Sequence, residues 1–210
     1  MKTLVLGATG MTGQHAVRML LDRGDIVTAF ARTPSAVPGT GGPERHRLRV
    51  VQGEARDAAS FERAVDGQDA VLSAFGPRSL KKDDIQEVFM KNLVAAMTKA
   101  GVKRLVNLSA WGAGDSLAGA ALMVRIIRAT ILRHMFDDKD RGEVILLASG
   151  LDFVNVRPGR LTNAKARGGV KASLTGEGVK PVLARADLAA FMVEQTQSDA
   201  WVRKSPLIGY

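Results

Sequence analysis

The sequence predicts an α/β fold, a doubly wound parallel sheet with helices on both faces. Short runs of β-branched and other apolar residues alternate along the chain with segments of helical periodicity, which is the pattern of βαβ units. A length of 210 residues suits one domain with a sizeable core. We therefore expect a single domain over residues 1–210, with a small substrate-side region at about 158–185.

Glycines mark the turn between the first strand and the first helix. Residues 3–6 form the short apolar run of a buried strand, and a helical pattern follows it. Between them, Gly7 would supply the tight turn, Gly10 would let the backbone approach a pyrophosphate, and Gly13 would let the helix pack closely on the strand. Free N–H groups at the helix start would meet the phosphate oxygens. The pattern predicts a Rossmann-like dinucleotide site, and the alternative is a purely structural turn.

The end of the second strand indicates which dinucleotide is bound. Residues 25–31 form this strand, and Arg32 and Thr33 follow it, where an NAD site usually carries Asp or Glu. An arginine pairs with a 2′-phosphate through two charge-assisted hydrogen bonds, whereas a carboxylate repels it. We expect NADP(H) to be preferred and NAD(H) to remain possible. The alternative is that Arg32 is an ordinary solvated charge.

The alternation of strands and helices continues to residue 157. Helices are expected at 58–65 behind an Asp57 N-cap, at 84–100 and at 137–148. Further strands are expected at 48–53, 70–74, 104–108 and 152–157. Ligands of such sheets bind beyond the carboxyl ends of the strands. One crevice should therefore be surrounded by the loops at 53–57, 74–77, 109–115 and 158–163.

Composition excludes several classes of site. The chain has no cysteine, so it forms no disulfide and holds no thiolate nucleophile or ligand. Its three histidines, His15, His46 and His134, are scattered, and we expect no metal site. No segment is long and apolar enough to span a membrane, and the N-terminus enters the first strand directly, leaving no room for a signal peptide. We expect a cytoplasmic protein, and its oligomeric state is not predicted.

The net charge of +9 raises the question of a nucleic-acid partner. The basic residues are spread along the chain, and only seven Phe, two Trp and one Tyr are available for stacking on bases. We do not expect nucleic-acid binding. A positive field also attracts an anionic dinucleotide or an acidic substrate.

Six segments carry a resemblance to a known family. They are GATGMTG at 7–13, FART at 30–33, GQDAVLSAFG at 67–76, NLSAWG at 107–112, SGLDFVNVRPGRLT at 149–162 and ARADLAAFM at 184–192. Over nearly its whole length the chain resembles the atypical short-chain dehydrogenases/reductases of the NAD(P)H-binding family that contains biliverdin reductase B, a flavin reductase. The resemblance implies a cofactor groove lined by Thr9, Met11, Thr12, Arg32, Thr33, Glu54, Ala55, Ala74, Phe75 and Gly76, with Ser109 and Ala110 beside the nicotinamide.

The chain departs from the pattern of these enzymes in its acid–base residues. Ordinary short-chain dehydrogenases use a Tyr-x-x-x-Lys pair to move a proton, but the only tyrosine here is Tyr210. Histidines line the substrate pocket of the biliverdin-reductase-like proteins, and Lys139 and Arg160 occupy the matching positions. The resemblance therefore does not carry over a biliverdin pocket.

Hydride transfer to a flavin, a quinone or a similar planar electron acceptor needs little proton transfer by the protein. A flavin would then be a substrate and not a tightly bound cofactor. Ser109 would bond the carboxamide or the acceptor, Trp111 would offer a stacking surface, and Arg160 would stabilise a developing anion. The respective alternatives are a loop-closing serine, a core tryptophan and a surface charge.

A second function class fits the same features. A non-catalytic NADP(H)-binding redox sensor of the NmrA-like type would also keep the groove and lack a catalytic tyrosine. Such regulators generally carry a larger domain in the C-terminal region, which is short here from Lys165 onward. The sequence therefore favours the reductase.

Residues 116–135 have apolar residues at helical spacing with arginines between them. Our default expectation is a helix packed on the core. A lid, a dimer interface and contact with a membrane surface are alternatives.

Overall fold

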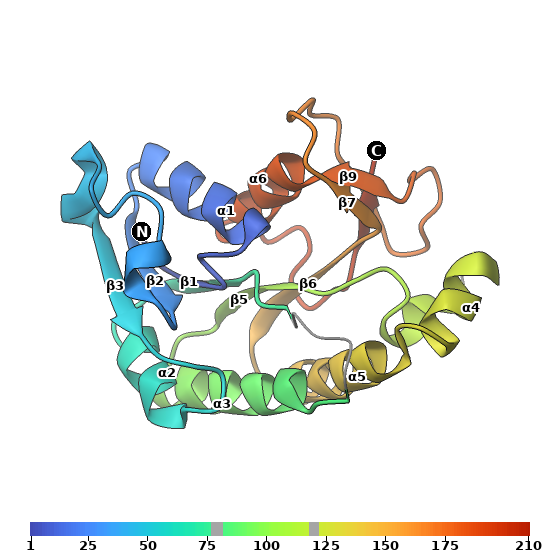
Figure 1. The fold of residues 1–210 in the computed structure, drawn as a ribbon, viewed down its shortest axis with the longest axis horizontal. Coiled ribbons are helices and arrows are strands. Elements are labelled where there is room, and N and C mark those ends of the chain that lie inside the picture. Colours follow the sequence, from blue (N-terminus) through green and yellow to red (C-terminus); the bar gives the residue numbers. More distant parts are fainter. Residues whose placement is uncertain (77–81, 118–121) are drawn as a thin grey trace.

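A central sheet with helices on both faces forms the molecule in the computed structural model, which describes residues 1–76, 82–117 and 122–210 (Figure 1). In these residues the sheet has eight strands in the order β3-β2-β1-β4-β5-β6-β10-β8. This confirms the α/β doubly wound fold. The strands are β1 (Lys2–Leu6), β2 (Ile26–Ala31), β3 (Leu48–Gln52), β4 (Ala70–Ser73), β5 (Arg104–Leu108), β6 (Asp152–Pro158), β8 (Lys171–Ser173) and β10 (Leu207–Gly209).

The strand order reverses between β1 and β4. From β1 the chain moves outward through β2 and β3, then crosses to β4 and continues outward through β5 and β6, all in parallel. β10 continues the parallel set beside β6, and β8 pairs antiparallel with β10. Ligands of open α/β sheets bind at the point where the order reverses, outside the carboxyl ends of the strands. The fold thus places a crevice beside the ends of β1 and β4.

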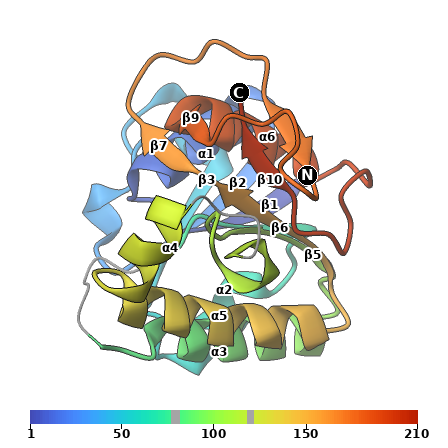
Figure 2. The same ribbon diagram turned by 90° about the vertical axis from the view of Figure 1, so that its right-hand side faces the viewer.

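Helices cover the two faces in two groups, visible above and below the sheet in Figure 1 and again in the turned view of Figure 2. One face carries α1 (Met11–Asp22) packed against α6 (Arg185–Gln195). The other carries α2 (Ala58–Val65), α3 (Ile85–Ala100) and α5 (Arg133–Ala148), with α3 packed against both neighbours. Short 3-10 turns occur at Pro34–Ala36, Pro43–Arg47 and Gly114–Leu117.

Each helical layer makes its own core with the sheet. Val17 and Leu20 of α1 are buried with Leu188 and Met192 of α6 on one side. On the other side a second cluster includes Phe61, Phe89, Leu93 and Met97. Burying a side chain of this size stabilises a fold by about 1.5–3 kcal/mol. Two cores therefore fix the sheet from both faces and hold the crevice between them.

Most predicted elements are confirmed within a residue or two, but the segment 116–135 is not. Asp57 caps α2 as expected, because its carboxylate accepts a hydrogen bond of 3.2 Å from the Ser60 N–H. The expected helix at 137–148 begins four residues earlier, at Arg133. Between the 3-10 turn and α5 lies a separate helix, α4 (Leu122–Ala129), and residues 118–121 lie outside the described part.

The default expectation for this segment, a helix packed on the core, is wrong for its described side chains. Ile126 is 50% exposed and Ile131 is 65% exposed. α4 contacts α5 and lies at the outer end of the molecule in Figure 1. The apolar face that the periodicity revealed is therefore directed in part toward solvent.

The C-terminal region contains strands that the sequence did not reveal. β7 (Arg160–Thr162) and β9 (Val182–Ala184) form a separate parallel pair, and β8 and β10 extend the main sheet. Each has only three residues, too few to show an alternating pattern. Tyr210 contacts both β9 and α6. Its hydroxyl donates a hydrogen bond of 2.5 Å to Asp187 and accepts one of 3.1 Å from the Ala184 N–H.

Candidate functional site

The turn after β1 has the geometry that requires glycine. Gly7 adopts a φ of +75°, and a Cβ there would lie 2.6 Å from the Ala74 carbonyl oxygen. A Cβ on Gly13 would lie 2.1 Å from the Gly7 carbonyl oxygen, so α1 sits directly against the turn. Gly10 is the N-cap of α1, and its N–H donates to the Gly7 carbonyl at 2.9 Å. The turn therefore brings the start of α1 and the end of β4 to one point.

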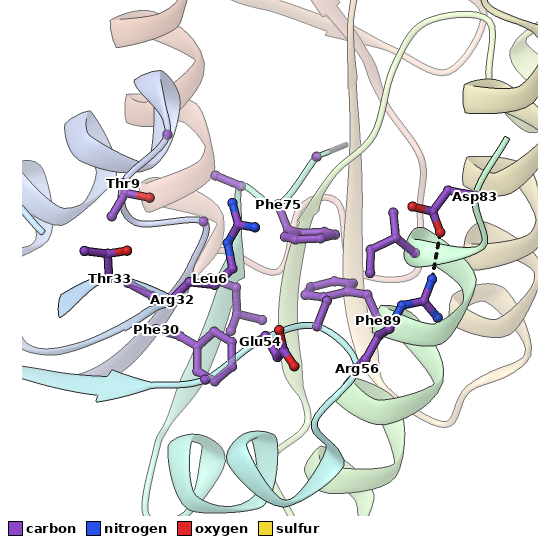
Figure 3. Close-up of a pocket in the computed structure, with 18 of the residues that line it drawn as sticks. Leu6, Thr9, Phe30, Arg32, Thr33, Glu54, Arg56, Phe75, Asp83 and Phe89 are labelled. Carbon is purple, nitrogen blue, oxygen red and sulfur yellow. Dashed lines mark hydrogen bonds and ion pairs between the residues drawn. The ribbon is translucent and has the colours of Figure 1, made fainter. Parts of the chain in front are cut away.

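A cavity of about 530 Å³ opens at this point (Figure 3). It is lined by the ends of β1, β2, β3 and β4 and by parts of α3 and α5. Ten of the residues expected to hold a cofactor line it, namely Gly7, Thr9, Gly10, Arg32, Thr33, Glu54, Ala55, Ala74, Phe75 and Gly76. Residue 77, at the end of one expected loop, lies outside the described part.

Aromatic rings form one wall of the cavity. The rings of Phe75 and Phe89 are stacked, with centroids 4.2 Å apart and planes inclined by 10°. Phe61 then packs edge-on against Phe89 and lies 5.0 Å from Phe30. Figure 3 shows Phe75 and Phe89 between Thr9 on one side and the ion pair of Arg56 with Asp83 on the other. This wall suits a flat ring system.

The rim carries charges of both signs. Arg32 is exposed, and Figure 3 shows its side chain extending into the cavity. Arg56, after β3, donates hydrogen bonds of 2.7 Å to Asp83 and 2.5 Å to Asp84, just before α3. The hydrogen bond from Arg56 lowers the pKa of Asp84, although partial desolvation opposes this. Arg56 thus joins two walls of the cavity.

Three residues of α5 on the lining were not predicted. They are His134, Met135 and Asp138, which share one face of the helix. The buried Asp138 carboxylate accepts from the N–H groups of Gln86 at 2.8 Å and Glu87 at 3.2 Å, at the start of α3. This contact joins residues about fifty positions apart, so no local pattern could have indicated it.

Five residues predicted at the cofactor do not line this cavity, and Ala110 is one of them. Met11, Thr12 and Gly13 lie in the first turn of α1, where Met11 is 57% exposed and Thr12 is buried. Ser109 is buried, its N–H donates to Val156 at 2.7 Å, and its hydroxyl donates to Glu143. The contribution of these residues to a bound nucleotide stays a prediction.

Trp111 and Arg160, predicted beside the acceptor, also lie off this cavity. The half-buried Trp111 follows β5, its N–H donates to the Pro158 carbonyl at 2.8 Å, and its ring lies beside Gly176. Arg160 is exposed on β7. Ser109, Trp111 and Arg160 do not line the cavity at the glycine turn, and their catalytic roles stay predictions.

A buried ionic cluster lies behind the loop that follows β5. Glu143 of α5 accepts a hydrogen bond of 2.6 Å from Arg157 of β6. One turn earlier on α5, Lys139 is also buried, and desolvation lowers its pKa although Glu143 and two aspartates oppose the shift. Perturbed titratable groups of this kind are common at functional sites.

A family model matches most of this chain. The model described as NAD(P)H-binding matches residues 7–199. The chain belongs to the NAD(P)H-binding family. The match spans the glycine turn, the strands β2, β3 and β4 beside the cavity, and α6. Membership of the NAD(P)H-binding family, expected from the sequence motifs, is confirmed.

Proteins similar to this chain include some that are described as reductases. Sterol demethylase protein B of Methylococcus capsulatus is 37% identical over 119 residues, which are 54% of this chain and 35% of that protein. The structure of ChuY, an anaerobillin reductase from Escherichia coli O157:H7, superposes with a TM-score of 0.80 at 21% identity and covers 100% of this chain and 97% of its own. A short-chain dehydrogenase/reductase of Veillonella parvula in complex with NADP gives 0.82 at 17%, covering 100% and 94%.

The chain spans about a third of the length of the curated relative. The solved structures match over the whole chain, and at their low identity they establish the fold.

Two features are absent from the described residues. No helix among them is long and apolar enough to cross a membrane. Within the same residues no three His, Cys, Asp or Glu side chains come together as a metal site.

Proposed function

We propose that this member of the NAD(P)H-binding family is an NADPH-dependent reductase that transfers hydride to a flavin, a quinone or a similar planar acceptor. The observation that carries the proposal is the cavity at the point of strand reversal, which joins the glycine turn, a flat aromatic wall and the arginine that follows β2. A dinucleotide has a pyrophosphate, a flat base and an acidic ribose substituent to match these three features.

The residues present fit a dinucleotide phosphate. The Gly7 and Gly13 positions have no room for a Cβ, so the backbone is held close to the start of α1, where N–H groups lack partners within the helix. Gly10 lies on the cavity at this helix start, and we assign the pyrophosphate to it.

Arg32 and Thr33 would hold the 2′-phosphate of NADPH. The Arg32 guanidinium is exposed at the cavity rim, so it forms hydrogen bonds to a phosphate without a large desolvation cost. Glu54 and Ala55 would face the adenine, with Phe75 in the apolar wall beside it.

The remaining work of the protein is orientation. When bound, the nicotinamide supplies a hydride to the acceptor. The Ser109 hydroxyl donates to Glu143, which leaves its oxygen lone pairs to accept from the carboxamide N–H₂. Trp111 and Arg160 would bound the acceptor on the side of β7. The structural neighbour described as an anaerobillin reductase supports a planar acceptor.

The test is consumption of NADPH by the purified protein, followed by the loss of its near-ultraviolet absorbance. FMN and a small quinone are offered as acceptors, with the Gly10→Val variant as the control. A Cβ at Gly10 is already only 3.2 Å from the Gly7 carbonyl oxygen, and the added methyl groups would occupy the phosphate position. Oxidation by the wild type and none by the variant supports the proposal. Absence of wild-type turnover with both acceptors contradicts it.

A redox sensor is the second candidate. One observation favours it. The only tyrosine of the sequence, Tyr210, is hydrogen-bonded to Asp187 and to the Ala184 N–H, and it does not line the cavity. A sensor must bind NADPH and NADP⁺ with different affinities to shift an equilibrium. Unequal dissociation constants without turnover would favour it over the reductase.

A further inference from the structure

The side of α4 that faces away from α5 carries exposed isoleucines (Figure 1). Arg128 marks the inward side of the helix, because it pairs with Asp140 of α5 and its guanidinium carbon lies 5.4 Å from the centre of the Phe136 ring. Ile126 is two positions before Arg128 and therefore points to the opposite side of the helix, with Ile127 beside it. Ile126 is 50% exposed and Ile127 is 37% exposed.

Ile131 extends this apolar surface beyond the end of α4, and it is 65% exposed. The Leu132 N–H donates to the Ile127 carbonyl at 3.1 Å, so the turn of the helix continues past the last residue of α4. Residues four apart lie on one side of a helix, which places Ile131 in line with Ile127. Ile126, Ile127 and Ile131 together form an apolar strip.

The segment that carries the apolar strip has only positive charges. Residues 116–136 include three arginines and no Asp or Glu. One of them, Arg128, is used by α5, whereas Arg125 and Arg133 are exposed. The Arg133 side chain stays 68% exposed although its Nε lies 3.7 Å from Asp137. A long arginine can lay its methylene groups along an apolar surface and keep its guanidinium at the polar edge. The partner of the strip is therefore both apolar and anionic.

The size of the strip favours a lipid surface over a protein. α4 has eight residues, and a helix of that length is about 12 Å long and about 10 Å wide. A stable interface between proteins buries about 800 Å² on each partner, which is far more than one such face. A bilayer needs no matched area, because each apolar side chain inserts by itself at the boundary between headgroups and acyl chains. Anionic headgroups also attract arginines close to the membrane.

We propose that α4 docks on the surface of a lipid bilayer that contains anionic lipids. The apolar strip inserts among the headgroups, and Arg125 and Arg133 bind the phosphates beside it. His134 and Met135 follow directly along the chain and line the cavity at the glycine turn. Docking thus holds this end of the cavity close to the lipid surface. The inference concerns a surface outside the cavity and does not rest on the proposed reductase function.

The test measures how much of the protein sediments with lipid vesicles. One set of vesicles contains phosphatidylcholine and phosphatidylserine in equal parts, and the other contains phosphatidylcholine alone. Each arginine near an anionic surface adds about 5-fold to the affinity. The wild type should therefore bind the vesicles with phosphatidylserine about 25-fold more tightly, because two arginines of this segment are exposed. Added salt should weaken this binding, because it screens the charges.

Two double variants separate the apolar and the charged contributions. Ile126→Gln with Ile131→Gln should weaken binding to the vesicles with phosphatidylserine by about 100-fold, since each buried isoleucine contributes roughly 10-fold. Arg125→Gln with Arg133→Gln should weaken it by about 25-fold and leave little difference between the two sets of vesicles.

Matched controls change exposed side chains outside α4. Val144→Gln removes an apolar side chain of α5 that is 66% exposed, and Arg49→Gln removes an exposed arginine of β3. Both should bind vesicles as the wild type does. All variants should keep the melting temperature of the wild type, because the altered side chains are exposed. A lower melting temperature in the isoleucine variant overturns the proposal, because these side chains then stabilise the fold.

The other outcomes are equally clear. A wild type that sediments with neither set of vesicles overturns the proposal, and so does an isoleucine variant that binds as tightly as the controls. A wild-type dimer in analytical ultracentrifugation that the isoleucine variant dissociates, without vesicle binding, also overturns it and identifies the strip as an interface between two copies of the chain. The assay contains no NADPH, so its result and that of the reductase test are independent.

Discussion

Glu143 and Arg157 form an ion pair of 2.6 Å in which only 3% of either side chain is exposed. The same guanidinium donates at 2.5 Å to Asp115, in the loop that follows β5. Gly114, with a φ of +54°, lies against it, and a Cβ there would be 2.6 Å from a guanidinium nitrogen. This one contact therefore joins α5, β6 and the loop that bears Ser109, and it sets where that loop lies.

Breaking this pair should destabilise the protein strongly. Removing one partner of a buried pair costs about 3–5 kcal/mol, because the other charge stays buried alone. Arg157→Leu should lose this much free energy of unfolding in urea, and Glu143→Leu with Arg157→Met together should recover most of it. Lys99→Met, which breaks the exposed pair with Glu62, is the control and should cost at most about 1 kcal/mol. A loss for Arg157→Leu as small as the control would contradict the account.

The glycine turn gives a second prediction. Gly13→Ala places a Cβ 2.1 Å from the Gly7 carbonyl oxygen, so α1 must move away from the turn. We expect a loss of about 1–3 kcal/mol in stability, as for other overpacked sites, and weaker binding of NADPH. Gly41→Ala is the control, because no atom lies within 4 Å of its Cβ position. Equal unfolding curves for the two variants would show that the turn tolerates a side chain.

Arg32 should set the preference between the two dinucleotides. Loss of a charge-assisted hydrogen bond costs about 1.5–3 kcal/mol, which is roughly 10- to 100-fold in affinity. Arg32→Ala should weaken NADPH binding by this factor and leave NADH binding nearly unchanged, as measured by calorimetric titration. Arg49→Ala removes an exposed arginine of β3 that does not line the cavity and should affect neither. Equal losses for NADPH and NADH would exclude a bond to the 2′-phosphate.

Tyr210 should make stability depend on pH through Asp187. Desolvation raises the pKa of Asp187, but hydrogen bonds from Tyr210 and from the N–H groups of Arg167 and Gly168 outweigh it, and the net pKa is lowered. A carboxylate with a lowered folded-state pKa adds stability above its unfolded pKa of about 3.9, and this stability is lost as the pH falls through the folded pKa.

Tyr210→Phe should therefore lower the melting temperature at neutral pH, and the difference from the wild type should shrink in acid. Melting curves from about pH 7 to below the unfolded pKa of about 3.9 check this. Asp187→Asn is the matched control, because it removes the titrating group and should make the Tyr210→Phe effect independent of pH. With Asp187 in place, a difference in melting temperature between Tyr210→Phe and the wild type that stays constant with pH would contradict this role of Asp187.

The sequence predicts the part of the site that depends on local geometry. Gly7 and Gly13 indicate the turn because neither position has room for a side chain. A Cβ on Gly13 would collide with the Gly7 backbone, and a Cβ on Gly7 would collide with the backbone at the end of β4. The Asp57 cap is likewise contained within four residues. The contacts of Gly13 and Asp57 each lie within one short segment, and the glycine motif that contains Gly7 is equally short although Gly7 meets Ala74.

The contribution of α5 to the site could not be predicted in the same way. Asp138 binds the start of α3, and Lys139 is buried, and only the tertiary arrangement reveals either feature. The resemblance to known enzymes drew attention to position 139 but not to its burial. The three-residue strands of the C-terminal region pair with residues far away, so their sequences carried too little pattern to be recognised.

The central claim is that hydride passes from NADPH, bound at the glycine turn, directly to an acceptor. We would follow the oxidation of NADPH carrying deuterium at C4, beside unlabelled NADPH, with a small quinone as the acceptor. The account predicts that the wild type consumes the deuterated cofactor more slowly and that Gly10→Val consumes neither. Tight binding of NADPH by the wild type with no oxidation of either form would contradict it and identify a binding protein instead.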